Sequence, residues 1–206
     1  MKTRAQLLAL PILIATIASC RDNRASIEIE SICFPSDDCT FGATCDKQVI
    51  GFTTMDVSQV SGAVLFLQVA NQLTDNANKD TGRTNTNGAH IDQVAVEYGS
   101  TLPRDVYDLS NQRIPSGGTA VIALDAIRPS TAASAALQAF APPGTVRSLV
   151  TKIRLRGYYD DGSRFETGEF PTAIQVCNGC LPTSACAAGK VACPSDGMDP
   201  VGCGST

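Results

Sequence analysis

The nine cysteines of this 206-residue chain gather at its two ends and leave the middle without any. Eight of them follow Cys20: Cys33, Cys39 and Cys45 near the front, and Cys177, Cys180, Cys186, Cys193 and Cys203 near the end. In an oxidising compartment such an even set is typical of a disulfide framework. Both groups are odd in number, so full pairing requires one or three bridges between them. The fold must therefore bring its two ends together.

The first twenty residues have the pattern of an export signal. Lys2 and Arg4 precede an apolar stretch over 5–18, and the run Ile-Ala-Ser-Cys ends at Cys20. This ending resembles the lipobox of bacterial lipoproteins, which implies loss of residues 1–19 and a diacylglycerol on the sulfur of Cys20. The stretch is shorter than the ~20 residues of a membrane-spanning helix. A plain secretory signal is the alternative.

The charge and composition of the chain exclude some classes of binding partner. The chain has 16 Lys and Arg against 20 Asp and Glu, and signal cleavage would remove Lys2 and Arg4. It has no basic run, which disfavours nucleic acid as a partner, and its net charge is negative, which disfavours electrostatic adhesion to anionic lipids. The predicted location is the cell envelope, with the lipid on Cys20 in a membrane and an envelope protein or glycan as partner. Arg21 gives no obvious signal for inner-membrane retention, so we expect the outer membrane.

The cysteine-free middle predicts an all-β fold. Short β-type runs alternate with turn signals, as in a sandwich or barrel. Seven strands over this length favour an immunoglobulin-like or fibronectin-like sandwich. The turn over 160–163, Asp-Asp-Gly-Ser, predicts a hairpin between the last two. The expected strands are 48–55, 62–72, 91–98, 104–109, 119–127, 146–158 and 163–176.

Two segments of the middle are not β-like. Residues 130–140 are rich in alanine, begin with Ser130 and precede Pro-Pro-Gly, which predicts one short crossover helix. Residues 74–88 are polar and read as a long exposed loop. The chain therefore divides into four parts: a signal peptide (1–19), a lipidated tether with the first cysteine cluster (20–47), a sandwich domain (48–177), and a cysteine-rich tail with little regular structure (178–206).

Metal sites are conceivable at two places, although we predict no metal and no cofactor. The oxygens of the 74–88 loop could serve calcium, but the order of residues does not match an EF-hand, and turns that satisfy their own backbone explain it better. Its candidate ligands are Asp75, Asn76, Asn78, Asp80, Asn85 and Asn87. Cys177, Cys180, Cys186 and Cys193 have spacing that permits zinc, but export favours disulfides. A redox-active Cys177–Cys180 pair is disfavoured because no βαβ pattern is present.

Catalysis is not predicted. His90 is the only histidine, with Asp92 two residues on, and no Gly-x-Ser-x-Gly elbow supplies a nucleophile. Asp160 and Asp161 lie in a hairpin turn, and Glu166 and Glu169 on the strand that follows. A turn and an exposed strand face explain these acids better than a glycosidase pair does. We therefore expect a binding or structural protein rather than an enzyme.

A carbohydrate- or peptidoglycan-binding module is the alternative function. Sugar binding on a sandwich commonly uses exposed aromatic rings, and the chain has no Trp. The role would fall to tyrosines. Tyr158 and Tyr159 are adjacent on one strand, so only one of them can face outward. The four tyrosines are Tyr98, Tyr107, Tyr158 and Tyr159.

Several stretches together resemble a known group. They are 71–73 with the Asn-rich loop that ends at Asn87, the run 152–157, Gly168-Glu169-Phe170, and 176–181 (Val-Cys-Asn-Gly-Cys-Leu). The chain resembles Cys-rich envelope lipoproteins of myxobacteria and related deltaproteobacteria, whose function is uncharacterised. The resemblance covers most of the mature chain and implies an envelope location, and it carries no catalytic residues.

Overall fold

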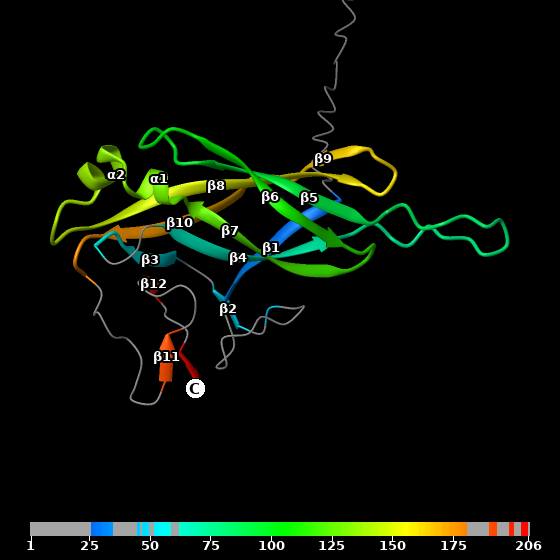
Figure 1. Cartoon of the computed structure of the whole chain (residues 1–206), viewed down its shortest axis with the longest axis horizontal. Helices are drawn as coiled ribbons and strands as arrows, with labels where there is room; N and C mark the ends of the chain where they lie inside the picture. The colour runs from blue at the N-terminus through cyan, green and yellow to red at the C-terminus, as the bar shows by residue number, and fades with distance from the viewer. Residues whose placement is uncertain are drawn as a thin grey trace, which may run out of the picture.

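The structure is a computed structural model that describes residues 26–34, 45, 47–49, 52–58, 62–180, 190–192, 198–199 and 203–205. It is an all-β sandwich of two sheets, as the sequence predicts (Figure 1). The elements are β1 (Ile27–Phe34), β2 (Lys47–Val49), β3 (Phe52–Asp56), β4 (Ala63–Asn71), β5 (Ala89–Glu97), β6 (Asp105–Ile114), β7 (Thr119–Ile127), α1 (Pro129–Ala132), α2 (Ala135–Phe140), β8 (Val146–Tyr159), β9 (Arg164–Glu166), β10 (Phe170–Cys177), β11 (Lys190–Ala192), β12 (Met198–Asp199) and β13 (Cys203–Ser205).

The small sheet has the order β2-β1-β4-β7. Strand β4 is apolar on both faces and lies in the interior of this sheet, where it pairs with β1 and β7. Buried and half-buried residues alternate along most of β4, so one face packs in the core and the other is partly covered.

The large sheet has the order β12-β3-β10-β8-β5-β6, and β9 pairs with β8. Strand β8 pairs with β5 along one edge and with β10 along the other. Strands β3 and β10 are parallel, so both end at the same edge of the sheet. The predicted hairpin turn is present between β8 and β9, where Gly162 takes a positive φ of 84°.

Alternating side chains from the two sheets form one core. On β5 and just after it, Val94, Val96 and Tyr98 are all buried, as their spacing predicts. The Tyr98 hydroxyl donates a 2.9 Å hydrogen bond to the carbonyl of Ala126 on β7. This bond ties the end of β5 in the large sheet to the small sheet.

The sandwich begins earlier than the sequence indicated. The segment predicted as a tether with the first cysteine cluster (20–47) contains β1, which lies within the small sheet and pairs with both β2 and β4. Ile27 and Ile29 are buried, whereas Glu28 and Glu30 between them are exposed. This alternation is the signal of a half-buried strand.

Smaller differences concern the helix and the tail. The alanine-rich segment forms two short helices, because Ser134 interrupts it and caps α2 by accepting a hydrogen bond from the Leu137 N–H. The tail contains three short strands, of which β12 pairs with β3 and so extends the large sheet. Among the residues that the structure describes, no helix has the length and apolar character needed to cross a membrane.

Two disulfides are described, Cys33–Cys45 and Cys177–Cys180. Each lies within one terminal group rather than between the groups. Cys20, Cys39, Cys186 and Cys193 lie outside the described residues, and Cys203 is described only as part of β13. The lipidation of Cys20 and the remaining pairings stay predictions.

Candidate binding site on the outer face of the large sheet

A β-bulge in strand β5 marks the candidate site. Between Ile91 and Gln93 the register of β5 shifts against both of its neighbours, β6 and β8. Asp92 is the extra residue opposite β8, where Ile91 pairs with Gly157 and Gln93 with Arg156. Bulges redirect side chains and are frequent beside functional sites. Here the bulge turns Asp92 toward the outer face of the sheet.

Gly157 allows β8 to lie very close to β5 next to this bulge. A Cβ atom at position 157 would lie 1.9 Å from the carbonyl oxygen of His90 and 2.8 Å from the Phe165 ring. Only glycine fits between these groups. Phe165 pairs with Gly157 across the β8–β9 hairpin and fills the space left by the missing side chain. The Phe165 ring in turn packs on Tyr159, with 5.0 Å between the ring centroids.

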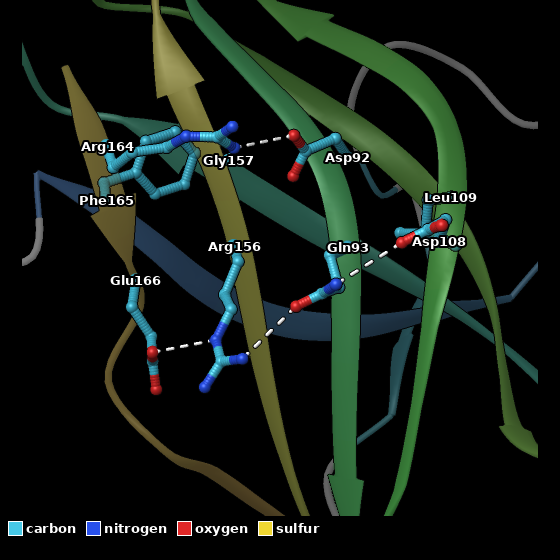
Figure 2. A pocket seen from close by; sticks show the side chains of 9 residues that line it. All are labelled: Asp92, Gln93, Asp108, Leu109, Arg156, Gly157, Arg164, Phe165 and Glu166. Atoms are coloured by element: carbon cyan, nitrogen blue, oxygen red, sulfur yellow. Dashed lines mark hydrogen bonds and ion pairs between the residues drawn. The ribbon is translucent and has the colours of Figure 1, made fainter.

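Together these features form a polar pocket of about 690 Å³ that spans β6, β5, β8 and β9 (Figure 2). Arg156 lies between Glu166, which it contacts at 2.8 Å, and Gln93, which accepts at 3.2 Å. The Gln93 amide donates in turn to Asp108 at 3.3 Å. The pocket is lined by Asp92, Gln93, Asp108, Leu109, Arg156, Gly157, Arg164, Phe165 and Glu166.

Arg164 closes one side of the pocket. Its guanidinium pairs with the Asp92 carboxylate at 2.9 Å and lies over the Tyr158 ring, 5.6 Å from the centroid. Three carboxylates and two guanidinium groups line the pocket, so neither sign of charge dominates. The pocket therefore offers hydrogen-bond donors and acceptors in similar number.

An ion-pair network continues from the pocket along the outer face of β8. Arg154 contacts Glu166 and Glu169, and Lys152 contacts Glu169 at 2.9 Å. Hydrogen bonds from Lys152 and then Arg154 hold the pKa of Glu169 below its usual range. Burial raises the pKa of Glu166, but bonds from Arg156 and Arg154 outweigh it and the net shift is downward.

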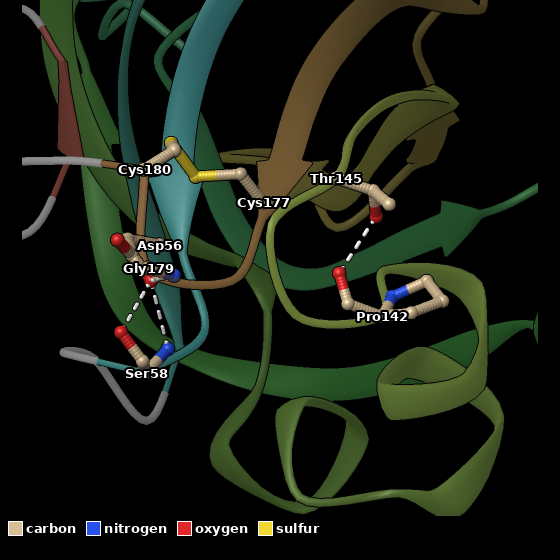
Figure 3. The surroundings of a disulfide bond; sticks show 7 residues. All are labelled: Asp56, Ser58, Pro142, Thr145, Cys177, Gly179 and Cys180. Atoms are coloured by element: carbon tan, nitrogen blue, oxygen red, sulfur yellow. Dashed lines mark hydrogen bonds between the residues drawn. A yellow bond between two sulfur atoms is a disulfide. The ribbon is translucent and has the colours of Figure 1, made fainter.

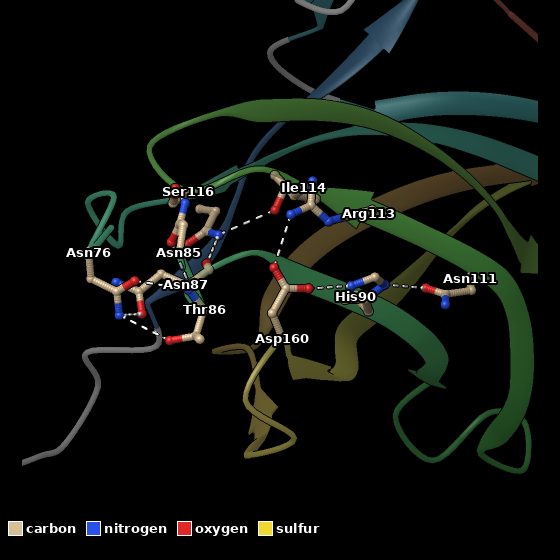
Figure 4. Close-up of polar contacts among 11 residues, drawn as sticks. Asn76, Asn85, Thr86, Asn87, His90, Asn111, Arg113, Ile114, Ser116 and Asp160 are labelled. Atoms are coloured by element: carbon tan, nitrogen blue, oxygen red, sulfur yellow. Dashed lines mark hydrogen bonds and ion pairs between the residues drawn. The ribbon is translucent and has the colours of Figure 1, made fainter. Parts of the chain in front are cut away.

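His90 belongs to a second network beside the pocket (Figure 4). Its Nε2 lies 2.7 Å from Asp160 and its Nδ1 lies 3.1 Å from the side-chain oxygen of Asn111. Its ring stacks on Tyr158, with 4.9 Å between centroids and 3° between planes. Arg113 also bonds Asp160, at 2.9 Å, and this bond followed by that of His90 lowers the pKa of the Asp160 carboxyl.

These contacts bear on the residues considered for catalysis. His90 pairs with Asp160, while Asp92, two residues on, pairs with Arg164 because the bulge separates their directions. Both His90 nitrogens contact oxygen atoms, and neither contacts a serine or cysteine among the described residues. The Asp161 carboxylate accepts bonds from the backbone N–H and hydroxyl of Ser163 within the hairpin turn. His90, Asp92 and Asp161 are thus each held in ion pairs or turn hydrogen bonds.

The four tyrosines differ in exposure. Tyr98 is buried. The Tyr107 hydroxyl donates to the Asp125 carbonyl at 2.7 Å and Arg128 lies over the Tyr107 ring, 5.0 Å from its centroid, so neither tyrosine offers a free ring. Tyr159 packs on Phe165 against the core, whereas Tyr158 stacks on His90 at the outer face. Only one of the adjacent pair faces outward, as the strand alternation predicts.

The Asn-rich loop is held by its own side chains. Asn76 bonds Thr86 and Asn87, and Asn85 bonds Ser116 on the neighbouring loop (Figure 4). The Asp75 and Asn78 oxygens accept backbone N–H bonds two residues on. Such bonds define Asx turns. The loop extends from one end of the sandwich, away from α1 and α2 (Figure 1).

The polar pocket residues that the sequence did not single out are Gln93, Asp108, Arg156 and Arg164. They lie on four strands, β5, β6, β8 and β9, next to the bulge in β5. Comparison of the chain with protein-family models, with curated proteins and with solved structures gives no match.

Proposed function

We propose that this chain is a non-catalytic binding domain, held in the bacterial cell envelope by lipid on Cys20, and that it binds its ligand in the pocket at the β5 bulge. The observation that carries the proposal is the polar pocket at the place where the bulge at Asp92 meets the close approach of β5 and β8 at Gly157. A bulge and a glycine weaken a sheet, yet here both stand at one place and are surrounded by polar side chains.

Stability alone does not account for this arrangement. Exposed ion pairs contribute ~0–1 kcal/mol each, so the Arg156–Glu166 and Arg164–Asp92 pairs are weak reasons for so many charges. The strands, in contrast, hold these groups in fixed directions. Preorganised polar groups favour binding because little ordering is needed when the ligand arrives.

The envelope location is supported by the signal pattern and by the resemblance to Cys-rich envelope lipoproteins. It is tested by fractionating cells that express the full chain. We expect the wild type in the membrane fraction, in the outer membrane rather than the inner one. Cys20→Ala should release the protein or leave it unprocessed. If the variant were processed and membrane-bound like the wild type, the anchoring proposal would fail.

An envelope glycan is the second candidate, and one observation favours it as ligand. Sugar hydroxyls both donate and accept hydrogen bonds, which suits a pocket with donors on Arg156 and Gln93 and acceptors on Asp92 and Asp108. Phe165 adds an apolar ring of the kind on which a sugar face can pack. Tyr158 is already stacked on His90, so it can serve only at the margin.

The glycan candidate is tested with the full lipoprotein in mild detergent, on a glycan array and with isolated peptidoglycan. We expect binding by the wild type and its loss in Arg156→Ala and Phe165→Ala. Arg147→Ala is the matched control, because Arg147 is an exposed arginine on the same strand and does not line the pocket. A blank array and no sedimentation with peptidoglycan would exclude the glycan and leave a protein ligand.

A further inference from the structure

The second disulfide of the structure lies beside a buried carboxylate. Cys177 ends β10 and Asp56 ends β3, and the parallel register of these strands places the two residues opposite each other. The sulfur atoms of Cys177 and Cys180 and a carboxylate oxygen of Asp56 all lie within 4.8 Å of one another. Figure 3 shows the carboxylate of Asp56 below the bond between the two sulfurs.

The two cysteines of this bond differ in access. Cys177 is 0% exposed, whereas Cys180 is exposed in the turn that follows β10. Asp56 is also 0% exposed. An incoming thiolate can therefore approach the sulfur of Cys180 but not that of Cys177, and access decides which sulfur of a disulfide is attacked.

The turn is held independently of the disulfide. The Gly179 N–H donates to the Asp56 carboxylate at 2.9 Å, and the Gly144 N–H donates to the Asn178 carbonyl at 3.0 Å. The Val57 N–H donates to the Cys177 carbonyl at 2.9 Å. With these bonds in place, the turn has support of its own if the two sulfurs separate.

A structural role explains this disulfide less well than it explains the other. In the chain-entropy model, the stabilisation by a disulfide grows with the length of the loop that it closes. Cys177 and Cys180 are 3 residues apart, whereas Cys33 and Cys45 are 12 apart. The Cys177–Cys180 bond therefore restricts the unfolded chain less than the Cys33–Cys45 bond does.

We propose that Cys177–Cys180 is an exchangeable disulfide that reacts with a protein dithiol, with Cys180 as the sulfur attacked and Asp56 as the proton-transfer group for Cys177. This function is independent of the pocket. The pocket residues lie on β5, β6, β8 and β9, whereas the disulfide and Asp56 lie at the ends of β3 and β10.

The exchange balances in two steps. A thiolate of the partner dithiol attacks Sγ of Cys180, which forms a mixed disulfide and breaks the Cys177–Cys180 bond. The electron pair of that bond leaves on Sγ of Cys177, which takes a proton through Asp56. The second thiolate of the partner then attacks the partner's first sulfur, which is bonded to Sγ of Cys180 in the mixed disulfide, and so releases the Cys180 thiolate. The partner leaves oxidised, and the two cysteines hold the two electrons that it has lost.

In the reverse direction, Asp56 acts as a base. The buried Cys177 thiol must lose its proton before its sulfur can attack a mixed disulfide on Cys180, because the thiolate is the nucleophile. A carboxylate oxygen of Asp56 lies within 4.8 Å of that sulfur. Its Oδ1 is already fixed by bonds from the Ser58 N–H, the Ser58 hydroxyl and the Gly179 N–H. Asp56 is thus oriented toward the disulfide before the reaction begins.

The first test uses the full lipoprotein in detergent with a series of reduced and oxidised glutathione mixtures. Free thiols are trapped by alkylation and located by peptide mass spectrometry. We expect Cys177 and Cys180 to be reduced and reoxidised reversibly in mixtures in which Cys33–Cys45 stays oxidised. Simultaneous reduction of both disulfides, or no reduction before the protein unfolds, would overturn the proposal.

Single-cysteine variants test the direction of attack. In Cys177→Ser the remaining Cys180 should form a mixed disulfide with glutathione. In Cys180→Ser the buried Cys177 should remain unmodified in the folded protein. Modification of Cys177 in preference to Cys180 would contradict the assignment. A reduced wild type that binds added zinc and then resists oxidised glutathione would favour a metal site and overturn the exchange role.

Asp56→Asn tests the proton transfer, since an asparagine oxygen can still accept the N–H bonds of Ser58 and Gly179. Loss of a general base lowers a reaction rate by ~10²-fold or more. We therefore expect Cys177 to displace glutathione from Cys180 about 10²-fold more slowly. Asp161→Asn is the matched control, because Asp161 makes the same Asp-x-Ser bonds in an exposed turn. If the adduct resolved at the same rate in both variants, Asp56 would have no role in the proton transfer. The identity of the attacked sulfur is tested separately by the two cysteine variants.

Discussion

The backbone of Gly157 lies so close to the carbonyl of His90 that a methyl group at position 157 would meet that oxygen at 1.9 Å. Gly157→Ala should therefore force β5 and β8 apart at the bulge. Steric overpacking costs ~1–3 kcal/mol and occasionally more, and we expect about 3 kcal/mol or more here because the obstacle is backbone. Urea unfolding measures this loss.

Gly168→Ala is the control for this prediction. Gly168 lies in the segment that leads to β10, and a Cβ there would meet nothing within 4 Å. Replacing glycine where the backbone permits it reduces the entropy of the unfolded chain, so we expect no loss and a gain of up to ~1 kcal/mol. If both variants lost equal stability, the close packing at Gly157 would not be the cause.

Tyr98→Phe should loosen the contact between the two sheets. The Tyr98 hydroxyl bonds the Ala126 carbonyl at 2.9 Å, and burial, followed by the charge of Asp105, raises the pKa of that hydroxyl. The variant would leave a buried carbonyl without this donor, which should lower the free energy of unfolding by ~1–3 kcal/mol. Equilibrium unfolding of Tyr98→Phe checks the value, and an unchanged midpoint would show that the bond does not hold the sheets together.

Acid should weaken the outer face of the large sheet. The pKa values of Asp160, Glu166 and Glu169 lie below their usual range, so their ion pairs stabilise the fold above the unfolded values of ~3.9–4.3. This stabilisation is lost as the pH falls through the lower folded values. NMR titration of the carboxyl groups should give midpoints below the reference for all three. Midpoints at or above the reference would contradict the ion pairs.

The described disulfides reduce the pairings open to the other cysteines. With Cys33–Cys45 and Cys177–Cys180 formed, one cysteine remains in the front group and three in the rear group. If all pair, Cys39 must bond one of Cys186, Cys193 and Cys203. We expect non-reducing peptide mapping to find this link, and its loss to cost ~4–5 kcal/mol in the chain-entropy model. A free thiol at Cys39 would contradict full pairing.

The sandwich could be predicted from the sequence because its strands alternate clearly. The face formed by Ile122, Leu124 and Ala126 is buried, and the strand 119–127 agrees with β7 in both bounds. Strand β1 shows the same alternation in Ile27, Glu28 and Ile29, but a segment that closely follows a lipid site is also expected to be a tether. The closeness of Cys20 therefore favours a tether at a place where the alternation of residues favours a strand.

The pocket could not be predicted in the same way. A bulge shifts the register by one residue, and regular alternation contains no signal for it. Asp92 was considered only as a partner of His90, whereas the bulge turns it to Arg164. Gly157, inside a strand rich in arginine, was the available signal, because glycine in a strand interior often marks a bulge or a close backbone approach.

Site-specific photo-crosslinking in living cells tests the central proposal most directly. A photoreactive residue is placed at Arg164 in the pocket, and as control at Arg147 on the exposed end of β8. The full lipoprotein is then extracted in mild detergent and its adducts are identified. We predict a reproducible envelope adduct from position 164, abolished by Arg156→Ala and absent from position 147. Equal adducts from both positions, or an adduct from 147 alone, would contradict binding at the bulge.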